Sequence, residues 1–137
     1  SYNLAPEVWL TKRSVKNGPA SPTSISAEVM FWVDSGGVAR PGGDVVANVT
    51  VNGQTWELWQ QDGAAGDARS GASWRLLSYK LSSPQLKGTL DIPAFMRDLV
   101  ARQLIDPNHY IATVEFGNEV TGGTGPTWVQ HFEVQTE

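Results

Sequence analysis

The chain is a succession of short apolar stretches separated by Gly, Pro, Asn and Ser, the residues most typical of turns. The strands of a β-sandwich or β-barrel are short and need a turn at each end, so this pattern indicates an all-β fold. The sequence contains no repeat, heptad pattern or low-complexity tail, and no apolar run is long enough to span a bilayer. Its 137 residues fit one domain.

Runs rich in β-forming residues predict the strands. Two of these runs flank Asn52-Gly53, the strongest short signal for a β-hairpin, because both turn residues tolerate positive φ. Polar or glycine-rich connections are expected at 12–26, 36–43 and 62–73. The predicted strands are 4–11, 27–33, 45–51, 54–60, 74–81, 110–120 and 127–135.

Residues 92–104 depart from the strand pattern, because their apolar residues recur at the spacing of one helix face. Asp91 is a suitable N-cap, and Pro93 suits the first helical turn. Asp106-Pro107 is expected to end the helix. The sequence therefore predicts several antiparallel strands and one α-helix.

Composition excludes several classes of function. A net charge of −4 at pH 7 provides no basic surface for nucleic acid or an anionic membrane. The absence of cysteine excludes disulfides, thiolate metal sites and cysteine nucleophiles. His109 and His131 are the only histidines, so a histidine-rich metal site is not expected. The six tryptophans either pack in the core or form a flat surface for the apolar faces of sugar rings.

Strand 27–33 contains one charged residue among apolar ones. Alternation places Glu28 with Met30 and Trp32 on one face, while the other face is wholly apolar. A strand covered on both faces is central, and a lone carboxylate there is costly unless it is paired or solvated. Glu28 is therefore a structural ion-pair partner, a strand-end residue facing water, or a carboxylate in a substrate groove, where a glycosidase needs one.

Strand 110–120 carries two more carboxylates on one face, Glu115 and Glu119. Gly117 lies between them and leaves room for close approach by a ligand or backbone. Glu119 precedes the glycine-rich segment 121–125. Spacing alone does not choose between the two glutamates, and it is also compatible with ordinary surface charge.

Strand 4–11 places Glu7 and Trp9 on one face. The pair is compatible with a groove lining. It is also compatible with an exposed charge beside a core or rim aromatic.

Taken in order, these motifs resemble glycoside hydrolase family 12. The family's nucleophile motif, roughly Glu-Leu-Met-Ile-Trp, corresponds to Glu28-Val29-Met30-Phe31-Trp32. Its Gly- and Pro-containing connection corresponds to 36–43, and its Gly-x-x-Trp hairpin to 53–59. Its acid/base motif, roughly Gly-x-Glu before a glycine-containing loop, corresponds to Gly117-Asn118-Glu119 and 120–123. The resemblance runs from about residue 5 to residue 135.

Two positions depart from the family pattern. Pro6-Glu7 replaces the usual Tyr-Asp, so Glu7 keeps the charge of the family's assisting Asp on a side chain one methylene longer. Val120 and Thr121 stand where an aromatic residue or Pro often follows the acid/base. Family members are also considerably longer at the N-terminus. We therefore expect 1–137 to be a single jelly-roll domain that lacks the family's N-terminal strands, which a missing N-terminal segment of the same enzyme would supply.

The resemblance implies an all-β antiparallel sandwich, a jelly roll with one α-helix, that cleaves β-1,4-glucan with retention. It implies that Glu28 is the nucleophile, that Glu119 is the acid/base and that Glu7 assists Glu28. No metal or organic cofactor is expected, and we expect a secreted enzyme. The residues expected to contact the polysaccharide are Trp9, Met30, Trp32 and Pro41.

A non-catalytic carbohydrate-binding jelly-roll module is the alternative function, because many jelly rolls are lectins. Such a module needs aromatic side chains but does not need two facing carboxylates. A structural or interaction domain that keeps the same fold is a third alternative. The sequence does not specify whether cellulose, mixed-linkage glucan or xyloglucan is preferred.

Overall fold

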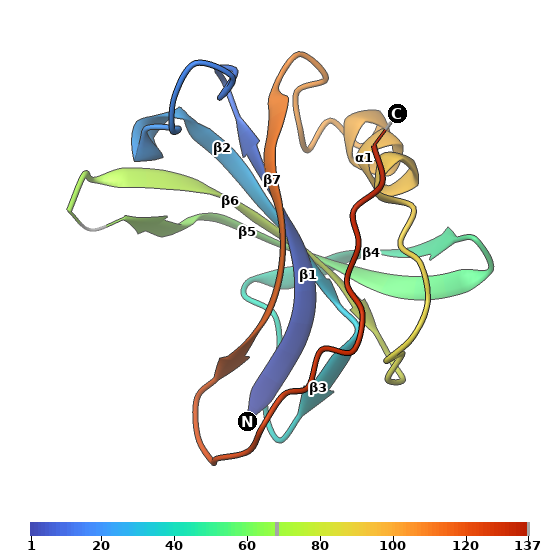
Figure 1. The fold of residues 1–137 in the computed structure, drawn as a ribbon. Coiled ribbons are helices and arrows are strands. Elements are labelled where there is room, and N and C mark those ends of the chain that lie inside the picture. Colours follow the sequence, from blue (N-terminus) through green and yellow to red (C-terminus); the bar gives the residue numbers. More distant parts are fainter. Residues whose placement is uncertain (68, 137) are drawn as a thin grey trace.

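The computed structural model describes residues 1–67 and 69–136, without the side chains of residues 64, 65 and 67. The described residues form seven strands, one short 3-10 helix and one α-helix (Figure 1). In chain order they are β1 (Tyr2–Thr11), η1 (Pro22–Ser24), β2 (Ile25–Trp32), β3 (Asp34–Gly36), β4 (Asp44–Val51), β5 (Gln54–Asp67), β6 (Ala72–Leu81), α1 (Ile92–Ala101) and β7 (Tyr110–Val120). The predicted all-β class with one helix is confirmed.

The seven strands join in one twisted sheet (Figure 1). Strand β1 pairs antiparallel with β2 and with β7, whereas β2 pairs on its other edge with β6 in parallel. Strands β6, β5 and β4 continue as antiparallel neighbours, and β3 pairs with the first residues of β1. Strand β2 is therefore flanked on both edges, as its two-sided apolar pattern predicts.

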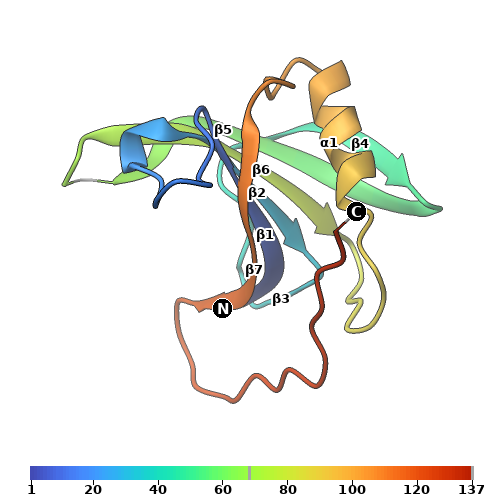
Figure 2. The same ribbon diagram turned by 45° about the horizontal axis from the view of Figure 1, so that its top comes forward.

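One face of the sheet forms the hydrophobic core, and α1 covers part of it near β4 (Figure 2). The core-facing residues alternate along each strand with residues of the opposite face. The buried members of this core are Val8, Leu10, Ala27, Val29, Phe31, Val33, Val49, Trp56, Leu58, Leu77, Tyr79, Phe95 and Leu99.

Phe95 forms the main contact between the helix and the sheet. Its ring meets Phe31, Tyr79 and Trp56 edge-on, with centroid separations of 4.8, 4.7 and 5.3 Å. Edge-to-face contacts of this kind stabilise a packed core beyond the burial of apolar area. The Tyr79 hydroxyl also donates to Asp98 Oδ2 at 2.6 Å, and burial together with this carboxylate raises the pKa of Tyr79. Helix α1 is thus held by both apolar and polar contacts.

The predicted hairpin at Asn52-Gly53 is confirmed. Both residues have positive φ, 48° and 80°, and Val51 pairs with Gln54 across the turn. This conformation matches the twist of the flanking strands, and glycine adopts it without steric cost.

The predicted connection at 62–73 is wrong, because strand structure extends into it from both sides. Gly66 pairs with Ser73, after a register shift between Gln61 and residue 65. The backbone ladder between β5 and β6 continues through small residues that carry no strand signal. Hydrogen bonding of main-chain groups, rather than side-chain pattern, forms the strands here.

Helix α1 begins where predicted and ends earlier, at Ala101 rather than at residue 104. Gln103 has φ 59°, and its N–H donates to Val100 O at 2.9 Å. The N–H of Leu104 donates to Leu99 O at 2.9 Å. These two bonds form a Schellman motif, which closes the helix before Asp106-Pro107 is reached. Within the described residues, no helix has the length and apolar character needed to traverse a membrane.

The predicted strand 127–135 is wrong. After β7 the chain turns back and runs toward α1 without forming a strand (Figures 1 and 2). Trp128 is 84% exposed, and Phe132 stacks on Phe116 with centroids 5.5 Å apart. A strand needs a neighbour with free main-chain groups, and among the described residues β7 pairs with β1 alone. Residues 127–135 therefore have an apolar pattern but form no main-chain ladder with a described strand.

Gln103→Gly should raise the free energy of unfolding by about 0.5–1 kcal/mol, because glycine adopts positive φ without the Cβ clash. The matched control is Ala101→Gly, which places glycine in the last helical residue and should lower stability by about 0.5–1 kcal/mol. Chemical denaturation of the three proteins measures both changes. Equal destabilisation by both substitutions would contradict the helix end described here.

Candidate active site

Four glutamates from three strands lie on the face of the sheet opposite the core. Glu28 on β2 is the Cα partner of Trp9 on β1. On the other edge of β1, Glu7 is the partner of Glu115 on β7. The fourth glutamate, Glu119, lies further along β7. Because side chains alternate along a strand, Glu7 shares a face with Trp9, and Glu115 shares a face with Glu119.

A cavity of about 330 Å³ opens on this face. Of the predicted site residues, Glu28, Met30, Trp32 and Glu119 line it. Its described lining is completed by Asn3, Arg40, Gly42, Gln61, Leu76, Ser78 and Thr121.

The other three predicted site residues lie outside the described lining. Glu7 and Trp9 lie beside Glu28, with Glu7 bonded to the Glu28 carboxyl. Pro41 is fully buried, while its neighbours Arg40 and Gly42 line the cavity. The structure thus brings together six of the seven predicted residues, and it places Pro41 behind the cavity wall.

The Glu7 and Glu28 carboxyl groups share a side-chain hydrogen bond. The pKa of Glu7 is raised to about 7, chiefly by burial and then by the charge of Glu28, the hydrogen bond with Glu28, and the charges of Glu115 and Glu119. Burial also raises the pKa of Glu28, but hydrogen bonds from Trp74 and Glu7 oppose that shift. Below pH 7 the shared proton therefore resides mainly on Glu7, which donates to an ionised Glu28.

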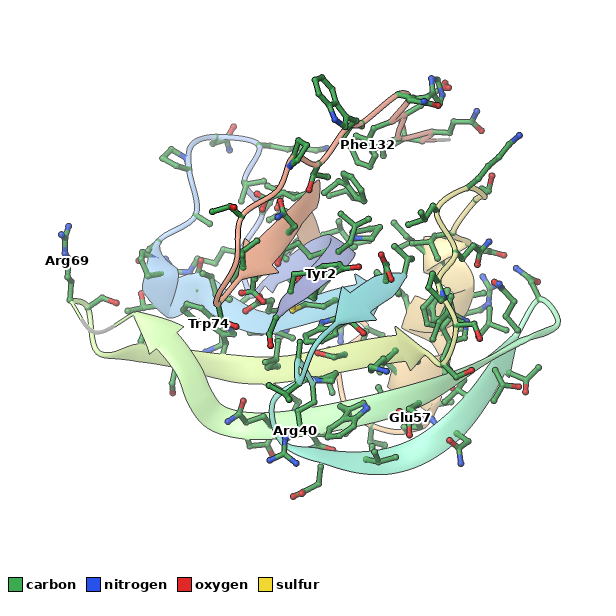
Figure 3. The ribbon with its side chains drawn as sticks, turned by 90° about the horizontal axis from the view of Figure 1, so that it is seen from below. Tyr2, Arg40, Glu57, Arg69, Trp74 and Phe132 are labelled. Atoms are coloured by element: carbon green, nitrogen blue, oxygen red, sulfur yellow. The ribbon has the colours of Figure 1, made fainter. Side chains whose placement is uncertain are left out.

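A tryptophan that the sequence analysis did not select bonds to the same carboxylate. Trp74 Nε1 donates to Glu28 Oε2 at 2.9 Å. Figure 3 labels Trp74 among the side chains of the sheet. The Trp74 ring meets Trp9 edge-on, with centroids 5.3 Å apart at 75°. The carboxylate thus has aromatic side chains from both neighbouring strands beside it.

Glu119 is oriented by a two-point contact with Asn3. Asn3 Nδ2 donates to Glu119 Oε2 at 2.7 Å, and the Glu119 main-chain N–H donates to Asn3 Oδ1 at 3.1 Å. Asn3 is only 3% exposed, and the two residues are Cα partners in the β1–β7 ladder. The side chain of Glu119 is therefore fixed by a buried amide while the residue itself remains open to solvent.

Two polar atoms in the cavity wall have no hydrogen-bond partner among the described residues. They are Trp32 Nε1 and Ser78 Oγ. Buried polar groups are nearly always paired, so both atoms are exceptions, and they are covered by other atoms although their residues line the cavity. The part of the chain that the structure describes holds no cluster of three or more His, Cys, Asp or Glu side chains suited to a metal ion.

The sequence analysis missed Asn3 and Trp74 for one physical reason. Each contacts a glutamate on another strand, Glu119 and Glu28, and these contacts depend on strand pairing that the sequence does not display. The parity of Asn3 with Glu7 was the one available signal, because it places both on the same face of β1.

Comparisons with known proteins identify the family. The sequence profile of glycosyl hydrolase family 12 matches residues 1–137. This chain is a member of glycosyl hydrolase family 12. Endoglucanase S from Pectobacterium parmentieri is 28% identical over 138 residues, which cover all of this chain and 50% of that protein.

Solved structures of family 12 members share the fold. The xyloglucanase from Bacillus licheniformis superposes with a TM-score of 0.75 at 28% identity, over 88% of this chain and 50% of that one. Endoglucanase cel12A from Rhodothermus marinus gives 0.69 at 33% identity, over 87% and 48%. These likenesses confirm the jelly-roll fold. The chain spans about half the length of the curated relatives it matches.

The raised pKa of Glu7 predicts how stability depends on pH. Folding favours the protonated form of Glu7, so its contribution is complete below its ordinary pKa of 4.5 and is lost as pH rises through about 7. The thermal unfolding midpoint should therefore fall over this interval. Glu7→Gln should flatten the fall, because the amide stays neutral at every pH.

The matched control for this titration is Asp44→Asn, which neutralises an exposed carboxylate on β4. It should leave the pH dependence of the unfolding midpoint unchanged. A Glu7→Gln profile that is parallel to that of the parental protein would show that Glu7 does not carry the shifted proton.

Proposed function

We propose that this chain carries the catalytic residues of a retaining endo-β-1,4-glucanase. The observation that supports this most directly is the pair Glu28 and Glu119, which come from different strands and line one cavity. Retaining glycosidases use two carboxyl groups on either side of the scissile bond, in environments that keep one ionised and let the other carry a proton.

Glu28 is the nucleophile in this proposal. Its carboxylate attacks the anomeric carbon, the bond to the leaving oxygen breaks, and a glycosyl-enzyme forms. Glu119 gives its proton to the leaving oxygen and then removes a proton from the incoming water. Glu7 holds a proton beside Glu28 and stabilises its ionised form by donating a hydrogen bond. Asn3 orients Glu119 for both of its steps.

The substrate in this proposal is a β-1,4-linked glucan. Relatives are named endoglucanase, and one from Aspergillus niger is named a xyloglucan-specific endo-β-1,4-glucanase. The polar lining residues Asn3, Arg40 and Gln61 are suited to sugar hydroxyls, and Met30 and Trp32 provide apolar surface for a ring face. A polymer of this kind is not taken up intact, so we also propose that the enzyme is secreted.

The carbohydrate-binding module remains the second candidate, because the same polar and aromatic lining residues would serve binding alone. It gives no role to the proton-sharing pair Glu7 and Glu28. Removal of a carboxylate therefore distinguishes the two functions, because it should stop hydrolysis and leave glycan binding in place.

Glu28→Ala should abolish hydrolysis, because no glycosyl-enzyme can form. Glu119→Ala should lower the rate on glucan by about 10²–10⁴-fold, the usual value of general acid–base assistance. An aryl glycoside with a good leaving group should partly escape that loss. Added azide should rescue Glu119→Ala with a β-glycosyl azide, and it should rescue Glu28→Ala with an α-glycosyl azide. The measurement is the anomeric configuration of the azide product.

Glycan binding by the two variants is the control, because stacking and the cavity wall supply much of it. Parental rates in both variants would overturn the assignment of Glu28 and Glu119. A parental protein that binds glucan without hydrolysing it would overturn the catalytic proposal in favour of a binding module. Exchanged azide stereochemistry would reverse the two roles and keep the reaction class.

We also propose that further β-strands complete the sheet beside β7. Among the described residues, the outer edge of β7 carries no ladder, and open edges of this kind are usually covered or blocked. Exposed apolar side chains follow it in the chain. They are Trp128, Val129, Phe132 and Val134.

Residues 1–137 produced alone should therefore unfold over a broad thermal range, because the uncovered edge and apolar side chains weaken cooperative packing. Differential scanning calorimetry measures the width of the transition and compares the calorimetric with the van't Hoff enthalpy. A sharp two-state transition of the isolated residues would contradict the proposal.

A further inference from the structure

Trp74 is placed to act on Glu28 without contacting the second catalytic glutamate. In the parallel β2–β6 ladder, Glu28 is the Cα partner of Leu76. Trp74 precedes Leu76 by two residues, so it lies on the same face and one step along the strand. From there its indole N–H reaches back to Glu28 Oε2 at 2.9 Å.

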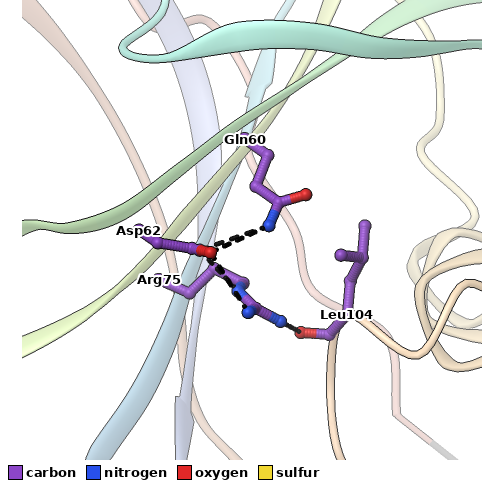
Figure 4. A network of polar contacts seen from close by, with 4 residues as sticks. All are labelled: Gln60, Asp62, Arg75 and Leu104. Atoms are coloured by element: carbon purple, nitrogen blue, oxygen red, sulfur yellow. Dashed lines mark hydrogen bonds and ion pairs between the residues drawn. The ribbon is translucent and has the colours of Figure 1, made fainter.

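The Trp74 ring and backbone are both held in place. Trp9 contacts the ring edge-on from the far side of β2. The next residue, Arg75, points to the opposite face, where it donates to Asp62 at 2.7 Å and to Leu104 O at 2.9 Å (Figure 4). These bonds tie β6 at this point to β5 and to the chain that leaves α1. The ring that carries the indole N–H is therefore contacted by Trp9, and its strand is anchored at the next residue.

The charges around Glu28 make such a donor important. Three other carboxylates lie near Glu28 on this face of the sheet, with one guanidinium in the cavity lining, and their charges do not balance. Further along the sheet, Lys80 on β6 and its Cα partner Glu57 on β5 also share this face. Strand β1 contributes Glu7, β7 contributes Glu115 and Glu119, and the β3–β4 connection contributes Arg40. Strand β6 contributes only uncharged side chains to the described lining of the cavity, Leu76 and Ser78.

An indole N–H is a donor only, and it has no charge to lose. It therefore stabilises an ionised acceptor at every pH at which the enzyme works. Glu7 differs in this respect, because it can donate to Glu28 only while it is protonated. As pH rises through about 7, Glu7 loses that proton and Trp74 remains as the donor.

We propose that Trp74 is a positioning residue for the nucleophile. Its indole N–H stops rotation of the Glu28 carboxylate and keeps that carboxylate ionised for attack. This inference rests on the proposed retaining mechanism. It assigns to Trp74 a role in the formation of the glycosyl-enzyme, distinct from stacking on the sugar.

Trp74→Phe tests the role, because it removes the N–H and keeps an aromatic ring of similar shape. In the full-length protein, the probe is the 2,4-dinitrophenyl glycoside of 2-deoxy-2-fluorocellobiose. Glu28 attacks its anomeric carbon, the bond to oxygen breaks, and dinitrophenolate leaves with the electron pair and without a proton. The rate therefore reports the nucleophile and does not depend on Glu119.

The rate constant for covalent labelling should fall roughly 10- to 100-fold, the value of one hydrogen bond to a charged group. The dissociation constant of the probe should change little. The acid limb of the kcat/KM profile should move to higher pH, because Glu28 loses a donor to its ionised form. The loss of rate should also grow above about pH 7, where Glu7 no longer donates.

Trp128→Phe is the matched control, because it makes the same change at a tryptophan outside the described lining of the cavity. It should leave the labelling rate and the pH profile unchanged. An unchanged labelling rate and pH profile in Trp74→Phe would overturn the positioning role. A selective rise in the dissociation constant would assign Trp74 to sugar binding instead. If the parental protein neither hydrolyses glucan nor takes up the label, the proposed function itself fails.

A measurement that leaves Trp74 in place keeps the inference testable if Trp74→Phe does not fold. The indole ¹⁵N–H resonance of Trp74, assigned by through-bond experiments, should shift upfield in Glu28→Gln, because a neutral amide is a weaker acceptor than a carboxylate. The resonance of Trp128 serves as the internal control and should not move. A Trp74 resonance that is insensitive to Glu28→Gln would show that the contact does not exist.

Discussion

The positions of the core side chains and of the cavity carboxylates depend on the pairing of β2 with two neighbouring strands at fixed register. Strand β1 sets Trp9 opposite Glu28, and β6 sets Leu76 opposite the same residue. Because side chains alternate, this register determines both faces at once. Val29 and Phe31 enter the core under α1, and Glu28 enters the cavity. Packing of the helix against the sheet and assembly of the carboxylates are therefore consequences of one set of main-chain hydrogen bonds.

The cavity concentrates negative charge on a sheet whose other face is apolar. Such a cluster would be costly without donors, and the fold supplies one for each carboxylate with a proposed chemical role. Trp74 and Glu7 bond to Glu28, and Asn3 bonds to Glu119. Three of these contacts join different strands. The polar groups therefore fix how the strands lie relative to one another as well as the state of each carboxyl.

The sequence predicted those features that depend on local pattern. The two faces of β2, the positive-φ turn at Asn52-Gly53 and the start of α1 all follow from residue type and spacing. Features set by partners were not predictable: the contact from Trp74 depends on a parallel pairing between distant strands. The predicted strand at 127–135 is wrong for the converse reason. The apolar pattern is present in the sequence, but the described residues provide no neighbouring strand for it to pair with.

Two bulges opposite β1, one on β2 and one on β7, bear on how the chain length of this protein can vary. The register of β1 shifts between Leu10 and Thr11 against β2, and between Trp9 and Leu10 against β7. Both shifts lie just beyond Trp9, where the site-lining part of the strand ends. A single residue inserted between Glu28 and Phe31 would exchange core and cavity side chains along the rest of β2. At the bulges an extra residue is already accommodated, Ser26 on β2 and Ala112 on β7. Insertions and deletions should therefore be tolerated in this fold near the starts of β2 and β7, opposite the end of β1, and excluded from the stretch of β1 between Asn3 and Trp9.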